Sequence, residues 1–184
     1  RLEMEKVRWG FIGAGMIAKK ALYPALMNSE VGEIYAVASR DTERAKELSP
    51  SGRIYTDYQD LLDDENVEAV YISLPNSLHI PWSIKAMQAG KHVLCEKPLA
   101  MNAAEVRTAI AVHDKTDLLF MEASWNRWHP RTLRIKELVD SGVIGNVKSI
   151  RTAFTYDGLS DENIRVFPKL GGGGLYDLGP YSVA

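Results

Sequence analysis

The clearest indication of the fold is the sequence VRWGFIGAGMIA, residues 7–18. Its first half, Val7 to Ile12, is a short apolar run of the length expected for a buried strand. From Met16 to Met27 the apolar residues instead recur at helical spacing. Gly13-Ala14-Gly15 lies between the two, so the chain turns sharply from a strand into a helix. This order predicts the first unit of a parallel α/β sheet.

The glycine pattern in this stretch is Gly13-x-Gly15-x-x-Ala18, in the setting that a dinucleotide-binding motif requires. Gly13 permits the tight turn, Gly15 lets the backbone approach a pyrophosphate, and Ala18 lets helix and strand pack closely. The pyrophosphate would lie at the helix N-terminus. We therefore expect a dinucleotide to contact Gly13, Gly15, Met16 and Ile17. The alternative is a tight strand–helix turn that binds no ligand.

Strands and helices continue to alternate after this unit. Further strands are expected at residues 33–38, 53–56, 67–73, 91–95 and 118–123, and helices or helical turns at 41–48, 60–64, 79–89 and 102–113. Asp41 is expected to cap one helix, and Asn102 with Glu105 to form a capping box on another. This alternation predicts a doubly wound, parallel α/β sheet, a Rossmann domain over residues 1–124.

The sequence changes character after Ser124. An irregular aromatic segment precedes an expected helix from Pro130 to about Asp140. A long alternating strand is expected from Asn146 to Tyr156, and a further helix begins near Leu175 after the glycine run of residues 171–174. We expect residues 125–184 to begin a second, α+β domain.

The composition is that of an ordinary soluble globular protein. The 184 residues are 46% hydrophobic and 25% charged, with a net charge of −2. This balance predicts no nucleic-acid or membrane partner, and no apolar stretch approaches the ~20 residues of a membrane span. The single cysteine, Cys95, excludes an internal disulfide, and the charged N-terminus lacks a signal-peptide core. We expect a reducing, cytoplasmic location and, because Cys95 and the histidines are scattered, no metal site.

The end of the second expected strand bears on which dinucleotide binds. An NAD site usually places an acidic residue there for the ribose hydroxyls. Here the strand ends in Ser39-Arg40-Asp41, and a hydroxyl beside a guanidinium suits a 2′-phosphate. NADP(H) is therefore favoured as the cofactor. NAD(H) stays open, because Asp41 could still reach a ribose.

The loop after the fourth expected strand carries further expected cofactor contacts. Ligands of a doubly wound sheet bind beyond the carboxyl ends of its strands. Leu74, Pro75, Asn76 and His79 lie at that edge. A turn role for Asn76 and a helix-start role for His79 are the alternatives.

The fifth expected strand ends in Glu96-Lys97-Pro98, which delivers Lys97 to the place where a nicotinamide would lie. Pro98 disfavours helical geometry at Lys97, and a cis bond between the two would be a rigid way to aim the lysine. Glu96 is expected to orient or partner Lys97, and both are expected to contact the cofactor. Otherwise Lys97 is a solvated loop cation.

Five motifs, in this order, resemble those of one known family. They are Gly13-Ala14-Gly15 after a strand, LPNSLH (74–79), CEKPLA (95–100), EASWNRWHP (122–130) and GGGGLYDLGPYSVA (171–184). From about Lys6 to its last residue the chain is similar to the glucose–fructose oxidoreductase and inositol dehydrogenase family, Gfo/Idh/MocA. EASWNRWHP and the spacing of Asp177 and Tyr181 most resemble the branch of glucose–fructose oxidoreductase and dimeric dihydrodiol dehydrogenase.

The resemblance implies an active site of Lys97, Asp177 and Tyr181. A tyrosine hydroxyl, whose pKa is ordinarily ~10, can exchange a proton with a substrate if a nearby ammonium lowers that pKa. Asp177 and Tyr181 are four residues apart, so a helix places them on one face. The spacing alone, without the resemblance, favours a core tyrosine and a helix-start aspartate.

The resemblance also makes Trp125, Arg127 and Phe154 expected walls of a substrate site. Aromatic core and a surface cation are the alternatives for these three residues. Arg165, in the segment NIRVFP of residues 163–168, is expected to reach substrate oxygens.

The implied function is that of an NADP(H)-dependent oxidoreductase acting on a hydroxyl or carbonyl of a sugar, polyol or trans-dihydrodiol. Two alternatives are a non-catalytic NADP(H)-binding regulatory protein and a glycosidase of the same fold that uses its nicotinamide transiently. The resemblance implies that the second domain has an open, mostly antiparallel sheet and forms homo-oligomers, dimers or tetramers. Because relatives continue well past this length, we expect the second domain to be truncated here.

Overall fold

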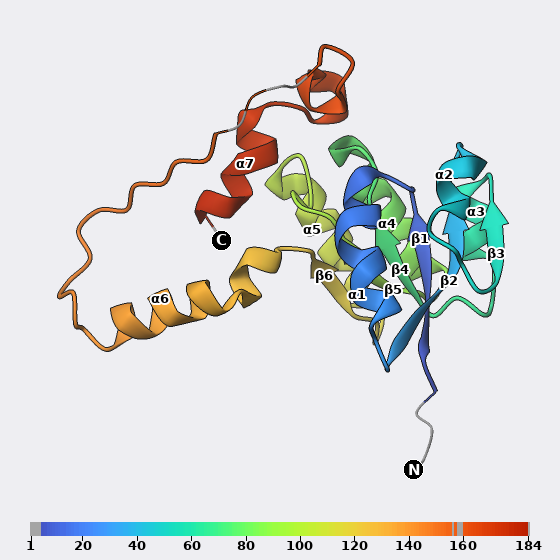
Figure 1. The fold of residues 1–184 in the computed structure, drawn as a ribbon, viewed down its shortest axis with the longest axis horizontal. Helices are drawn as coiled ribbons and strands as arrows, with labels where there is room; N and C mark the ends of the chain where they lie inside the picture. Colours follow the sequence, from blue (N-terminus) through green and yellow to red (C-terminus); the bar gives the residue numbers. More distant parts are fainter. Residues whose placement is uncertain (1–4, 156, 158–159, 184) are drawn as a thin grey trace.

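The computed structural model describes residues 5–155, 157 and 160–183. Its centre is a parallel sheet with the strand order β3-β2-β1-β4-β5-β6 (Figure 1). The strands are β1 (Val7–Ile12), β2 (Gly32–Ala38), β3 (Arg53–Tyr55), β4 (Ala69–Ile72), β5 (His92–Cys95) and β6 (Phe120–Glu122). Every described pairing between them is parallel, which confirms the predicted doubly wound α/β sheet. The strand order reverses between β1 and β4, where such folds bind their ligands.

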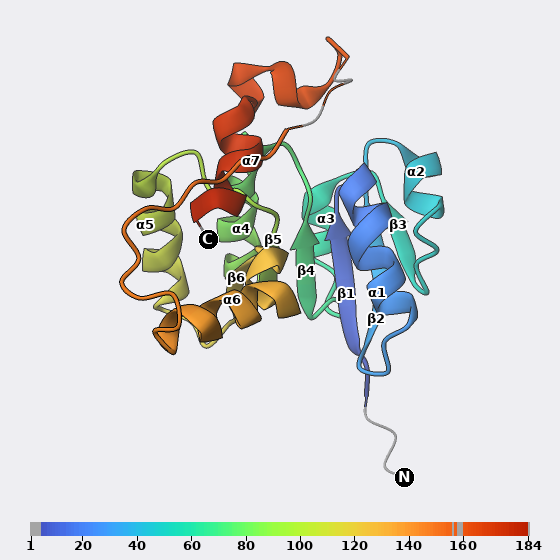
Figure 2. The ribbon, with the colours of Figure 1, turned by 60° about the vertical axis from the view of Figure 1, so that its left-hand side comes forward.

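Helices cover both faces of this sheet, as Figure 2 shows for α1 in front of it. They are α1 (Tyr23–Met27), α2 (Thr42–Lys46), α3 (Tyr58–Leu62), α4 (His79–Gln88) and α5 (Ala103–His113). Ile12 and Ile72 belong to a core cluster with α3, α4 and α5. Phe11 and Tyr71, one position earlier on the same strands, belong to a second cluster with α1 and α2. The strands are therefore apolar almost throughout, because both of their faces are buried.

The helix predicted at residues 16–27 forms, but its middle is wound more loosely. Residues Ala18–Leu22 are π-helical, and the Tyr23 N–H bonds to the Ala18 carbonyl before α1 continues. Pro24 has no N–H to donate to the carbonyl of residue 20, so a regular α-helical bond is missing there.

Both predicted helix caps are confirmed. The Asp41 carboxylate accepts hydrogen bonds from the Glu43 and Arg44 N–H groups, each at 3.1 Å. Asn102 Oδ1 accepts from the Glu105 N–H at 3.0 Å. The Glu105 carboxylate reaches the Met101 N–H at 3.0 Å, one residue before the position that a capping box predicts.

The chain from Trp125 onward leaves the sheet and returns to it. A 3₁₀ turn, Trp125–Trp128, leads into α6 (Pro130–Asp140), and two more, Ile164–Val166 and Pro168–Leu170, precede α7 (Gly174–Val183). The helices predicted at Pro130 and near Leu175 are thus confirmed. Figures 1 and 2 show the segment after α6 running outward and α7 lying back toward the sheet. No helix in the described ranges is both long and apolar enough to cross a bilayer.

The long strand predicted at residues 146–156 is wrong for the described residues 146–155. This segment is irregular, and most of its side chains are exposed, with Ile150 at 78%. A strand needs a neighbour for its backbone hydrogen bonds, and no described segment pairs with this one. Side-chain alternation along the sequence does not supply that neighbour. Tyr156 lies outside the described residues, and no antiparallel pairing occurs among the residues that are described.

Candidate active site and cofactor site

The loop between β1 and the next helix lies at the carboxyl edge of the sheet. Gly13 has a φ of +94°, and a Cβ there would lie 3.1 Å from the Ser73 carbonyl oxygen, so the loop itself requires glycine. At Gly15 an added Cβ would make only ordinary contact, 3.5 Å from the same oxygen. The packing of the chain therefore does not demand glycine at position 15. Glycine at this position leaves the backbone accessible to a ligand.

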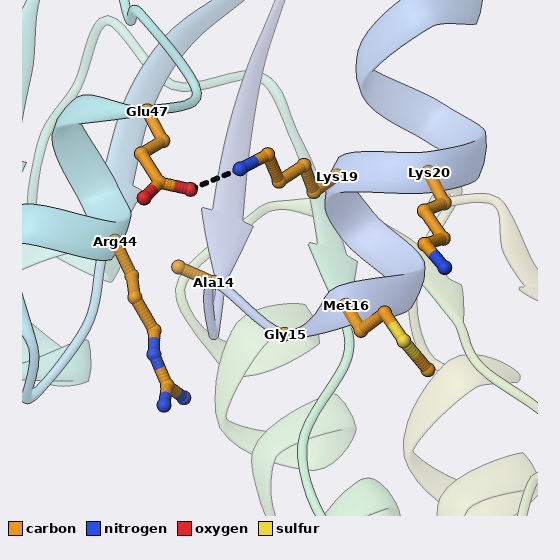
Figure 3. Close-up of a pocket in the computed structure, with 7 residues that line it drawn as sticks. All are labelled: Ala14, Gly15, Met16, Lys19, Lys20, Arg44 and Glu47. Atoms are coloured by element: carbon orange, nitrogen blue, oxygen red, sulfur yellow. Dashed lines mark hydrogen bonds and ion pairs between the residues drawn. The ribbon is translucent and has the colours of Figure 1, made fainter.

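A cavity of about 620 Å³ adjoins this loop (Figure 3). Its lining consists of Ala14, Gly15, Met16, Lys19, Lys20, Arg44 and Glu47. Lys19 is paired with Glu47, and Arg44 extends from α2 into the space beside the loop. The lining holds three cations and one carboxylate, and this excess of positive charge suits a ligand with phosphate groups.

The lining adds residues that the sequence prediction does not contain. Gly15 and Met16 were expected there and line the cavity, whereas Ile17 is exposed outside the lining. Lys19, Lys20 and Arg44 are additional. A signal for Arg44 was present in the sequence, because its helix begins directly after the residues expected to hold a 2′-phosphate.

The residues at the end of β2 differ in whether their side chains already bond to other parts of the chain. Ser39 is buried, and its Oγ accepts from the Asp41 N–H at 3.1 Å. The Asp41 carboxylate caps α2 and also pairs with Arg44 Nε at 3.1 Å. Arg40 is exposed, and no hydrogen bond or ion pair joins it to the described residues. Asp41 is thus occupied by its own helix, whereas Arg40 is available.

His79 lies in the core, not in the cavity. It is 1% exposed, with Nδ1 at 2.7 Å from Pro98 O and Nε2 at 2.8 Å from Leu74 O. Burial lowers the pKa of His79, and the two carbonyls partly oppose that effect. The imidazole therefore ties the loop after β4 to the loop after β5.

Asn76, in the loop after β4, also bonds within the chain. Pro75 precedes a 3₁₀ turn, Asn76–Leu78. Asn76 Nδ2 donates to the Gly171 carbonyl at 2.7 Å, which joins this loop to the segment before α7. Asn76 was expected to face the cofactor, so this contact across the molecule is new.

The Glu96 carboxylate is held by two groups, neither of which is the Lys97 ammonium. Tyr71 Oη donates to Glu96 Oε1 at 2.7 Å, and the Lys97 N–H donates to Oε2 at 3.2 Å. Burial, and then the Glu96 charge, raise the pKa of Tyr71. Glu96 was expected to orient Lys97, and its carboxylate contacts the backbone N–H of Lys97, not the ammonium group. Tyr71 was not predicted, although a tyrosine in a buried strand needs a partner for its hydroxyl.

The Lys97 ammonium reaches across to α7. Lys97 Nζ donates to the Asp177 carbonyl at 2.6 Å and to Asp177 Oδ1 at 3.2 Å, and both side chains are largely buried. The Lys97–Pro98 peptide is cis, as the sequence suggested. Arg165 Nε pairs with the other carboxylate oxygen, Asp177 Oδ2, at 3.1 Å. Arg165 is thus bound to Asp177, a partner that the sequence did not indicate.

Tyr181 lies at the centre of an aromatic group beside this lysine. Lys97 Nζ is 4.8 Å from the centroid of the Tyr181 ring. Phe154 stacks on that ring at 5.5 Å, and Trp125 meets it edge-on at 5.9 Å. Trp125 Nε1 donates to Tyr181 Oη at 3.3 Å. An ammonium, a hydroxyl and two aromatic rings are therefore gathered at one place, and a hydroxyl beside an ammonium is chemically able to exchange a proton with a bound group.

One residue expected in the substrate wall lies outside this group. Arg127 is exposed, and among the described residues no hydrogen bond or ion pair connects it to Tyr181 or Lys97. Within the described ranges, no three His, Cys, Asp or Glu side chains are arranged to hold a metal ion.

Two family models match the chain. The model described as "Oxidoreductase family, NAD-binding Rossmann fold" matches residues 7–124. The model described as "GFO/IDH/MocA C-terminal domain" matches residues 132–184. The two matches together span most of the sequence.

Curated relatives extend this similarity. A D-xylose 1-dehydrogenase (NADP(+)) of Haloferax volcanii is 40% identical over 182 residues, 96% of this chain and 55% of the relative. A trans-1,2-dihydrobenzene-1,2-diol dehydrogenase of Mus musculus is 38% identical over 182 residues, 96% of this chain and 54% of the relative. The chain thus spans about half the length of the curated relatives that it matches.

A solved structure has the same fold. The crystal structure of a 3-ketoreductase from Actinomadura kijaniata, in complex with NADP and TDP-benzene, matches with a TM-score of 0.91 and 37% identity. The match covers 96% of this chain and 55% of that chain. Further crystal structures of the reductase carry a replaced lysine or a replaced tyrosine.

Proposed function

Because the chain belongs to the Gfo/Idh/MocA oxidoreductase family, we propose that the protein is an NADP(H)-dependent oxidoreductase. Its proposed reaction transfers hydride between nicotinamide and a hydroxyl or carbonyl group of a sugar, polyol or trans-dihydrodiol. One observation carries the proposal: Lys97, Asp177 and Tyr181 come together at the carboxyl edge of the parallel sheet. That edge is where a doubly wound sheet binds its ligands.

The preference for NADP(H) over NAD(H) rests on the surroundings of the glycine loop. Asp41 caps α2 and pairs with Arg44, so its carboxylate is engaged away from a ribose. Ser39, Arg40 and Arg44 offer one hydroxyl and two guanidinium groups for a 2′-phosphate. NADP in the names of the xylose dehydrogenase and of the reductase complex supports this choice.

The rest of the cofactor site follows from the same edge. The backbone at Gly13, Gly15, Met16 and Ile17 would hold the pyrophosphate at the helix N-terminus. Leu74, Pro75, Asn76 and His79 belong to the loop expected beside the nicotinamide half, with Glu96 and Lys97 on the neighbouring loop. The packing of the chain does not by itself demand glycine at position 15, and this supports a ligand contact there.

The residues of this chain handle the proton, while bound nicotinamide supplies or accepts the hydride. Tyr181 Oη exchanges a proton with the substrate oxygen. Negative charge that develops on Tyr181 is stabilised by the Lys97 ammonium over its ring and by the Trp125 indole N–H. Asp177 holds the ammonium in place through its carbonyl and its carboxylate.

The relative from A. kijaniata supports these roles. Its replaced lysine and replaced tyrosine are separated by the same number of residues as Lys97 and Tyr181. Trp125 and Phe154 would form the wall for an apolar face of a sugar or diol ring. Arg127 and Arg165 remain predicted substrate contacts. Arg165 also forms an ion pair with Asp177.

The cofactor half of the proposal is tested by titrating the protein with NADPH and with NADH while following nicotinamide fluorescence. We expect tighter binding of NADPH, and loss of that preference in Arg40→Asp. Equal affinities would overturn the choice of NADP(H). Turnover with sugars and diols, measured as net NADPH formed, then separates an oxidoreductase from a regulatory binder or a glycosidase, neither of which gives net reduction.

We also propose that the chain divides at residue 124, and that the domain beginning there has an open, mostly antiparallel sheet and forms homo-oligomers. The exposed apolar side chains of residues 143–150 support this, because such surface favours association. Sedimentation of the protein at several concentrations tests it. A monomer throughout would contradict the proposed dimer or tetramer.

A further inference from the structure

The first glycine of the run before α7 lies in a tight junction with the β4 loop. Gly171 is buried, has a φ of +81°, and accepts the 2.7 Å hydrogen bond from Asn76 Nδ2 at its carbonyl. A Cβ at Gly171 would lie 2.6 Å from Asn76 Cβ and 2.5 Å from Met101 Sδ. The methionine sulfur can move, but a Cβ is fixed to its backbone. Any side chain at position 171 therefore forces the two segments apart.

A second bond fastens the same segment one turn further along. Tyr176 Oη donates to the Met101 carbonyl at 2.9 Å. The Asp177 N–H bonds to the Gly173 carbonyl at 3.0 Å, so the first turn of α7 is built directly on the glycine run. The position of Asp177 beside Lys97 thus depends on where Gly171 and its neighbours are docked.

The four glycines of the run are not equivalent. A Cβ at Gly172 would lie 2.5 Å from the Arg165 carbonyl oxygen, and Gly173 has a φ of +120°. At Gly174 an added Cβ meets nothing within 4 Å, and the backbone is not left-handed. Alanine is a better helix former than glycine, so Gly174→Ala is a matched control for Gly171→Ala.

From this junction we infer that Asn76 and Gly171 are positioning residues, a latch that docks α7 so that Asp177 and Tyr181 meet Lys97. The catalytic consequence rests on the proposed function, whereas the docking itself does not. The latch also joins the loop expected to face the cofactor to the helix that carries the tyrosine.

Hydrogen–deuterium exchange of the intact protein tests the docking without turnover. In Gly171→Ala the amides of residues 171–183, Asp177 among them, should exchange at least about tenfold faster, because both the left-handed backbone and the close contact are lost. Gly174→Ala should exchange like the unchanged protein. Protection of β1, β4 and β5 should be the same in all three, which shows that the sheet is folded. Equal exchange in Gly171→Ala and Gly174→Ala would overturn the latch.

A second variant and a kinetic readout separate the latch from the proposed function. Asn76→Asp keeps the size of the side chain but removes the donor, and it should also loosen residues 171–183. Gly171→Ala should lower kcat by at least about tenfold with unchanged NADPH affinity. An unchanged kcat beside faster exchange would overturn the positioning role. If the unchanged protein neither binds NADPH nor turns over, the proposed function fails while the exchange result still decides the docking.

Discussion

Lys97 Nζ lies 4.8 Å from the centroid of the Tyr181 ring, although the two residues belong to a strand end and to a helix far along the chain. The ammonium sits over the face of the ring, and its hydrogen bonds go to Asp177. The phenol and the cation are therefore held together by a third residue. Their separate contributions can be measured, because each can be changed while the others stay in place.

Tyr181→Phe removes the hydroxyl and keeps the ring that stacks on Phe154 and lies under Lys97. Turnover should fall by about 10²–10⁴-fold, the usual contribution of a general acid or base. NADPH affinity and the melting temperature should change little. Steady-state kinetics, fluorescence titration and thermal unfolding check the three statements. A variant with normal kcat would remove Tyr181 from the proton transfer.

Lys97→Met should also abolish most of the turnover, because the charge that stabilises a developing tyrosinate is lost. In Lys97→Met the largely buried Asp177 carboxylate keeps its ion pair with Arg165. Lys97→Arg keeps the positive charge but changes its shape, so it should recover part of the rate. Comparison of kcat in the two variants tests whether charge is what matters. Equal loss in both would favour a role for the specific geometry of the ammonium.

Arg44→Ala should weaken NADPH binding by about tenfold, since one charge-assisted hydrogen bond to a phosphate contributes about that much. NADH binding should be unaffected. Lys46→Ala is the control, because Lys46 is an exposed cation of the same helix that pairs with Glu43 and does not line the cavity. Fluorescence titrations with both cofactors distinguish the cases. A similar loss of NADH affinity in Arg44→Ala would mean that Arg44 contacts a part of the cofactor other than the 2′-phosphate.

His79 should make stability depend on pH. Because burial lowers its pKa below the ordinary 6.5, the folded protein keeps the ring neutral while the unfolded chain takes up a proton first. The stabilisation is present above pH 6.5 and is lost as the pH falls toward the folded pKa. Urea unfolding should therefore show that, between about pH 7.5 and pH 5.5, the free energy of unfolding falls more steeply with falling pH in the protein with His79 than in His79→Gln. Parallel slopes would show that His79 does not titrate as its burial implies.

Cys95 should be inert in the folded protein. It is fully buried, and burial raises the pKa of its thiol well above the ordinary value. A thiol reagent should label it only after denaturant is added. Rapid labelling of the native protein would reveal opening of the sheet near β5, and the rate measures how often that occurs.

The sequence determined the first part of the fold because its signals are local. Gly13 needs a left-handed backbone, and the apolar strands with helices between them leave a parallel sheet as the solution that buries both faces. The caps at Asp41 and Asn102 were predictable for the same reason, since each bonds to a backbone group two or three residues away. Lys97 could be placed at the sheet edge because it lies two residues after the end of a strand.

Contacts between residues that lie far apart in the chain could not be predicted from local patterns. Asn76 donates a hydrogen bond to Gly171, the Tyr71 hydroxyl donates one to Glu96, and Arg165 forms an ion pair with Asp177. Residues 146–155 alternate like a strand and are irregular, because pairing requires a neighbour that no pattern within the segment specifies. Local sequence limits which backbone shapes and buried faces are possible. Which distant groups then come within hydrogen-bonding distance is set by how the loops close and where α7 docks.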